Sequence, residues 1–170
     1  HCPCCRQSQR AKPRHSRITQ TKLVTRIIPD LQCSLMCEEV RQEATGNPML
    51  IGVLTGLVVP QLPVTAHQIA CFNRWTAGVG EFTENVKIIA PDASTTLCEN
   101  KIKYGLKRPE DILTNVHIFR NVEFKEPGFY QVEISVDDVL KLRYPFPVNL
   151  VPPNKQGREQ TGGDDPPQRQ

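Results

Sequence analysis

The strongest constraint on the fold is an alternation of apolar and polar side chains near the C-terminal end of the chain. Its apolar members are Tyr130, Val132, Ile134 and Val136. Successive side chains of a strand point to opposite faces, so this pattern predicts a strand with one buried face. Asp137 and Asp138 then predict a turn, and the alternation resumes over 140–148, which completes a hairpin. Pro145 and Pro147 cannot donate hydrogen bonds to a neighbouring strand, so we expect this second strand at a sheet edge.

Shorter apolar alternations predict six further strands, over residues 31–37, 49–59, 69–75, 82–90, 98–104 and 116–124. We place Val116, Ile118, Val122 and Phe124 on the core face of the last one, with a bulge or exposed end at Arg120. Segment 49–59 is apolar on both faces, which is typical of a central strand covered on each side. One turn of helix is compatible with residues 109–112. The pattern predicts an all-β fold, an antiparallel β-sandwich of about seven or eight strands.

The two ends of the chain lack such a pattern. We expect a disordered basic tail containing Cys and His over residues 1–30, the β-sandwich domain over 31–151, and a disordered polar tail over 152–170. The first residue is His rather than Met, so it stays open whether residues 1–20 belong to the native protein.

Several segments between the tails have a familiar sequence: Leu35–Arg41, Ile51–Val53, Val59–Val64, Lys87–Asp92 and Glu126–Val132. Together they resemble an uncharacterised bacterial family (domain of unknown function 6941) over roughly residues 31–150. The resemblance implies an immunoglobulin-like sandwich. In it, Tyr130 would be a tyrosine at a sheet corner, with its hydroxyl bonded to nearby backbone. The resemblance supplies no activity, substrate or catalytic residue.

The N-terminal tail carries the densest set of potential metal ligands, which are His1, Cys2, Cys4, Cys5 and His15. Their spacing does not give the Cys-x2-Cys pair of a zinc knuckle, and no second pair follows. Residues 1–29 also hold seven basic residues and no acidic one, although the whole chain has a net charge of only +3. A nucleic-acid accessory protein acting through this arm is therefore our alternative hypothesis. We prefer a disordered tail and do not expect nucleic-acid binding.

Within the domain, no residues form a recognisable catalytic, cofactor-binding or metal site. Cys33 and Cys37 lie about 13 Å apart on a regular strand, too far for one zinc ion, and Cys71 and Cys98 occupy apolar positions expected in the core. His117 lies between Val116 and Ile118, so we expect it to point into solvent. We predict neither catalytic residues nor a cofactor, and we expect the protein not to be an enzyme.

One apolar segment, residues 57–64, occupies a position where a polar loop is expected. Either it folds over the open end of the sandwich, or Leu57, Val58, Val59 and Leu62 form an interface. We favour the first interpretation and keep the second. The sequence has no apolar run long enough to span a membrane and no export signal, so we expect a cytoplasmic protein with reduced thiols. The function we predict is a non-enzymatic interaction module that binds an unknown protein partner or a second copy of itself.

Overall fold

The predicted C-terminal hairpin is present in the computed structural model, which describes residues 25–152. It consists of β8 (Gly128–Val136) and β9 (Val139–Leu150), which pair antiparallel. The two turn residues, Asp137 and Asp138, have φ values of 46° and 66°. Positive φ at both central positions is the geometry of the two-residue turn whose twist matches that of the flanking strands.

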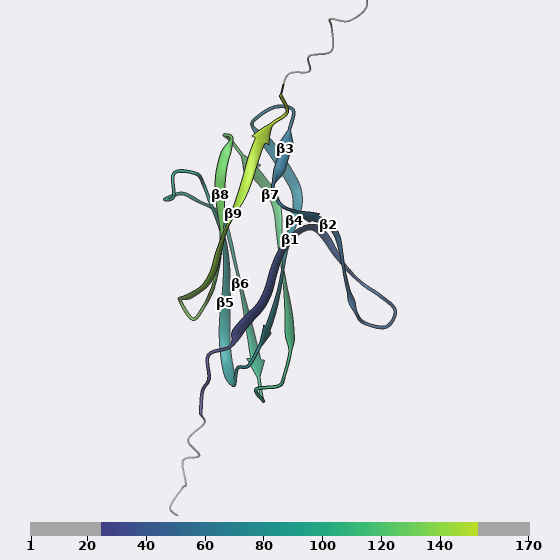
Figure 1. The fold of residues 1–170 in the computed structure, drawn as a ribbon, viewed down its shortest axis with the longest axis vertical. Coiled ribbons are helices and arrows are strands. Elements are labelled where there is room, and N and C mark those ends of the chain that lie inside the picture. Colours follow the sequence, from purple (N-terminus) through teal and green to yellow (C-terminus); the bar gives the residue numbers. More distant parts are fainter. Residues whose placement is uncertain (1–24, 153–170) are drawn as a thin grey trace, which may run out of the picture.

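Seven further strands precede this hairpin, and all nine are arranged in two sheets (Figure 1). They are β1 (Asp30–Gln42), β2 (Pro48–Leu54), β3 (Leu57–Val59), β4 (Val64–Thr76), β5 (Gly80–Ile89), β6 (Thr96–Leu106) and β7 (Leu113–Phe124). The first sheet has the order β2-β1-β4-β7, and the second has the order β3-β9-β8-β5-β6. Neighbouring strands are antiparallel except β3 and β9, which are parallel. The described residues contain no helix, and residues 109–110 form a turn. The all-β prediction is therefore confirmed.

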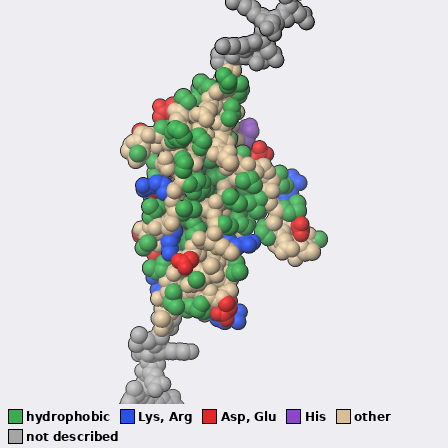
Figure 2. Space-filling model, in the orientation of Figure 1, with side chains coloured by type: hydrophobic (Ala, Val, Ile, Leu, Met, Phe, Trp, Pro, Cys, Tyr) green, Lys and Arg blue, Asp and Glu red, His purple; other side chains and the backbone are tan. Residues whose placement is uncertain are grey.

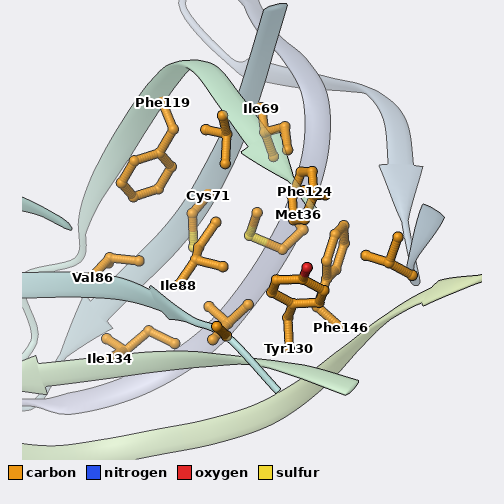
Figure 3. Packing of buried hydrophobic residues seen from close by; sticks show 14 of the residues in the cluster. Met36, Ile69, Cys71, Val86, Ile88, Phe119, Phe124, Tyr130, Ile134 and Phe146 are labelled. Carbon is orange, nitrogen blue, oxygen red and sulfur yellow. The ribbon is translucent and has the colours of Figure 1, made fainter. Parts of the chain in front are cut away.

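The core lies between the two sheets, and both contribute side chains to it. Figure 3 shows Met36, Cys71 and Phe124 from the first sheet pointing toward Ile88 and Tyr130 from the second. Phe124 and Tyr130 meet edge to face, with ring centroids 5.1 Å apart. Cys71 belongs to this core and the half-buried Cys98 packs against it, as the sequence predicts.

The prediction for β7 placed the wrong side chains on the core face. Asn115, His117 and Phe119 point inward, whereas Ile118 is exposed. Asn121 has a φ of 54°, and beyond it the buried positions change from odd to even numbers, so Val122 and Phe124 are again inside. An irregularity is thus present at Asn121, next to the predicted position at Arg120, but β4 and β7 keep one register through it, so it is not a bulge. The predicted solvent-exposed position of His117 is wrong. The prediction extended the even-numbered core positions of Val122 and Phe124 back along the strand, but before Asn121 the core positions are the odd-numbered ones.

The apolar segment 49–59 is not one central strand. It divides at Thr55 and Gly56 into β2 at the edge of the first sheet and β3 at the edge of the second. A Cβ atom at Gly56 would lie 2.4 Å from the carbonyl oxygen of Pro147, so the chain can pass from one sheet to the other here only with glycine. The long apolar run reflects a strand that changes sheets rather than a strand covered on both faces.

Candidate interaction surface

The predicted interface residues are divided between the core and the surface. Leu57, Val59 and Leu62 pack against the hydrophobic core, whereas Val58 is 68% exposed. The preferred interpretation, that segment 57–64 covers the end of the core, agrees with the positions of these three side chains. Val58 is the member of the set that a partner could reach.

A cluster of polar side chains lies in the middle of the core and was not predicted. Glu84 of β5 extends from the second sheet toward Asn73 of β4 and Asn115 of β7 in the first. The side-chain amides of Asn73 and Asn115 each donate a hydrogen bond of 2.5 Å to a different oxygen of the Glu84 carboxylate. His117 Nε2 lies 3.2 Å from Glu84 Oε1 but does not align for a straight hydrogen bond, so this contact is electrostatic. The cluster fixes the position of one sheet against the other.

The carboxylate of Glu84 is stabilised in its charged form. Burial raises its pKa, but His117 and the two asparagine amides together outweigh burial and hold the pKa of Glu84 below its ordinary value. Both Glu84 and His117 have an exposed fraction of 0%. A general acid or base must come within hydrogen-bonding reach of a substrate, and these side chains are closed off from solvent. The cluster is therefore a structural clasp rather than a catalytic site.

The sequence does contain a signal for this cluster. Glu84 falls at an inward position of a strand in which Phe82, Val86 and Ile88 share the core face, and Asn73 falls between Cys71 and Trp75 in the same way. A polar residue at an inward position of an apolar alternation indicates a buried polar group that needs a partner. His117 and Asn115 could not be found in this way, because the irregularity at Asn121 reversed the face to which they were assigned.

A cleft of about 570 Å³ is lined by residues of β6, β7 and the loops beside them, including Asp92, Cys98, Arg120 and Tyr130. Two of its titratable groups have strongly shifted pKa values. Hydrogen bonds from Thr95 and Ser94 lower the pKa of Asp92 to about 2, and burial raises the pKa of Cys98 to about 12. The Tyr130 hydroxyl donates a 2.9 Å hydrogen bond to the backbone oxygen of Glu126, which confirms the predicted tyrosine corner contact. The Cys98 thiol is therefore not an activated nucleophile.

The most unusual surface is the free edge of β2. The hairpin formed by the outer parts of β1 and β2, together with the turn at residues 43–47, stands clear of the rest of the molecule (Figures 1 and 2). We call this projection the arm. Among the described residues, β2 (Pro48–Leu54) pairs only with β1; it contains no charged residue, and its one proline, Pro48, is its first residue. Soluble proteins generally protect such an edge with charges, prolines or short strands, because unpaired main-chain groups attract other strands.

The other sheet edges in residues 25–152 carry that protection. The outer strand β3 has only three residues, and β6 bears Glu99, Lys101 and Lys103. Strand β9 pairs with β3 only at residues 148–150, so the rest of that edge of β9 has no neighbouring strand. This open part contains Pro145 and Pro147. The predicted edge position of these two prolines is thus confirmed for the open part of the strand. The fourth outer strand, β7, carries Arg120 and Glu123 beside its irregularity at Asn121.

The hydrogen bonding at the tip of the arm shows which main-chain groups of β2 face outward. Glu43 donates its backbone N–H to the backbone oxygen of Asn47, and the same register pairs Val40 with Leu50. Hydrogen-bonded and non-hydrogen-bonded pairs alternate along an antiparallel ladder, so Leu50 belongs to a non-hydrogen-bonded pair. Its N–H and C=O groups therefore point away from β1, toward the free edge.

Two further findings limit the chemistry of the described residues. No group of three or more His, Cys, Asp or Glu side chains within residues 25–152 is arranged to hold a metal ion. The same part of the chain has no helix of the length and apolarity needed to cross a membrane. The Cys and His residues at the N-terminus, with the zinc and nucleic-acid hypotheses attached to them, lie outside the described residues, as do both predicted disordered tails apart from a few residues next to the sheets.

Comparison with known families matches residues 32–149 to a family of unknown function (DUF6941). The chain belongs to this family. The resemblance seen in the sequence is thereby confirmed at the level of the family. The match to DUF6941 takes in almost all of β1, the whole of β2 and the residues of the buried clasp, so the arm and the clasp both lie in the family domain. No curated protein matches the chain.

Proposed function

We propose that this protein is a non-enzymatic interaction module that binds an extended polypeptide segment along the free edge of β2. In strand addition of this kind, main-chain hydrogen bonds provide much of the affinity and side-chain contacts adjust it. The observation that carries the proposal is the uncharged, unpaired edge of a strand that projects from the body on the arm. We further propose an immunoglobulin-like topology for the fold, supported by the two packed sheets and the hydroxyl-to-backbone bond of Tyr130.

A non-enzymatic role is supported by the chemistry of the polar groups. The clasp around Glu84 is closed to solvent, and the thiol of Cys98 in the cleft has a raised pKa. Neither place brings an activated nucleophile next to a general base at the surface.

The test uses a fluorescent peptide with the sequence of β2, residues 48–54, flanked by lysines for solubility. Its binding to the full chain is followed by fluorescence anisotropy. We expect saturable binding by the wild-type protein and by Leu50→Ala, which keeps the outward N–H group. Leu50→Pro removes that N–H group without removing a hydrogen bond to β1, so we expect its affinity for the peptide to fall at least tenfold. Equal binding by the two variants, or no binding by any form, would contradict the proposal.

A second form of the experiment leaves the protein unchanged, in case Leu50→Pro disturbs the arm. Two peptides are made, one N-methylated at alternate residues and the other at the residues between them. Only one edge of the peptide can pair with β2, so one methylated peptide should bind like the unmodified peptide and the other should not bind. If both bind equally well, the peptide is held by side-chain contacts and strand addition is excluded.

A further inference from the structure

We infer that the segment bound at the edge of β2 is the β2 strand of a second copy of this chain, in an antiparallel pair about a two-fold axis. This inference rests on the proposed function, because it names the partner for the same edge. The four-stranded sheet of one copy would then join the four-stranded sheet of the other, and together they would form one continuous sheet. Both copies would contribute the same surface, as in most symmetric dimers.

The side chains of β2 are suited to pairing with themselves. Ile51 is the middle residue of Pro48–Leu54, and an axis at Ile51 uses the whole strand. In that register Met49 faces Val53 of the other copy, Leu50 faces Gly52, and Ile51 faces itself. The opposing residues of the two β2 strands are all uncharged, although the side chain of Glu38 on β1 lies beside Gly52. A partner strand rich in charged residues would lack this match.

The main-chain groups agree with the same register. The N–H and C=O groups of Leu50 point to the free edge, so the pair formed by Leu50 and Gly52 of the other copy is the hydrogen-bonded kind. Gly52 has a φ of 63°, and its pairing with Glu38 is interrupted. Glu38 and Gly52 occupy a non-hydrogen-bonded position of the ladder, as Val40 and Leu50 do, so no ladder hydrogen bond to β1 is lost there. A strand from a second copy would supply partners at this point.

The shape of the arm makes such an approach possible. The arm extends from the first sheet beyond the rest of the molecule, so two arms can meet edge to edge while the bodies stay apart (Figure 1). The exposed side chains of Met49 and Val53 lie along the arm, and strand pairing would cover part of them.

The experiment measures the molar mass of the full chain by light scattering after size-exclusion chromatography, over a range of concentrations and at two salt concentrations. We expect the wild type and Leu50→Ala to approach twice the chain mass of 19.2 kDa as concentration rises. We expect Leu50→Pro to remain at the mass of one chain. Because β2 carries no charge, salt should change the dimer little. The β2 peptide should convert the dimer to the monomer.

The matched control is Val58→Asp, which alters an exposed apolar side chain on β3, away from the arm. It should leave the dimer intact. A wild-type chain that stays monomeric at every concentration would overturn the inference. In that case the peptide experiment still decides the proposed function: saturable peptide binding that requires Leu50 supports it, and no binding rejects it as well. A dimer that survives Leu50→Pro but is lost in Val58→Asp would place the interface at β3 and overturn the inference.

Discussion

Each oxygen of the Glu84 carboxylate accepts a hydrogen bond from an amide on the opposite sheet, so one side chain joins three strands. The contacts with Asn73 and Asn115 are short, at 2.5 Å, and all three side chains are shielded from water. Hydrogen bonds to a charged group in such surroundings are stronger than those between neutral groups. Their loss also leaves buried polar atoms unpaired, which adds to the cost.

This arrangement predicts the effect of Glu84→Gln on stability. Glutamine keeps one acceptor oxygen, but its NH2 group faces an asparagine NH2 group that also needs an acceptor. We expect the free energy of unfolding to fall by about 1–3 kcal/mol, measured by urea denaturation. Glu123→Gln, at an exposed position of β7, is the control and should have little effect. A Glu84→Gln protein as stable as the wild type would show that the clasp does not contribute to stability.

At the scale of the elements, the alternation of side chains predicted most of the strands. Strand β8 was predicted well because its alternation is unbroken up to the turn at Asp137 and Asp138. In β9 the alternation is buried at Phe146 and Val148, but Leu140 and Leu142, which the pattern placed on the inward face, are exposed. The prediction failed where the backbone departs from a regular strand. The positive φ of Asn121 shifted the core face of β7 by one residue, and the corner at Gly56 divided one predicted strand between two sheets. Neither residue type fixes such a backbone geometry by itself.

The candidate interaction surface was harder to predict than the fold. The sequence drew attention to the apolar residues near Val58, but it assigned β2 to the centre of a sheet. An uncharged run has the same composition whether the fold covers it or leaves it at an edge. Only the order of the strands in the sheet separates the two cases, and that order depends on contacts between distant parts of the chain.

The turn between β8 and β9 gives a prediction at this scale. Asp138 has a φ of 66°, which glycine adopts without steric cost. We expect Asp138→Gly to raise the free energy of unfolding by up to about 1 kcal/mol, and Asp138→Ala to lower it. Asp137 is left unchanged, because its carboxylate accepts the backbone N–H of Thr83 at 2.9 Å and pairs with Arg26. Thermal unfolding of the three proteins would measure the order, and a destabilised Asp138→Gly would contradict it.

For the molecule as a whole, the two sheets are held together by an apolar core with a charged group at its centre. The pKa of Glu84 is lower in the folded protein than its ordinary value of 4.5. At pH values near 4.5 the unfolded chain therefore binds more protons at this position than the folded protein does. The stability that Glu84 contributes is fully present above that pH and is lost as the pH falls through the folded pKa.

The expected result is a difference between two pH profiles. The wild-type protein should lose stability in acid more steeply than Glu84→Gln, which has no carboxyl group to protonate there. Urea denaturation from neutral pH into the acid range measures both profiles. The exposed carboxylates are the same in the two proteins, so they contribute equally to each profile. Profiles that run parallel would show that Glu84 is protonated equally easily in the folded and unfolded chains.

The tight corner at Gly56, where the chain rests on Pro147, has a consequence for how the arm would work. One end of β2 is anchored to the body at this corner, and β1 continues from the arm directly into the core at Met36. Both strands of the arm are thus fixed where the arm joins the rest of the molecule. A binding edge that is already ordered loses little conformational entropy when it meets its partner, so more of the hydrogen-bond energy is retained as affinity.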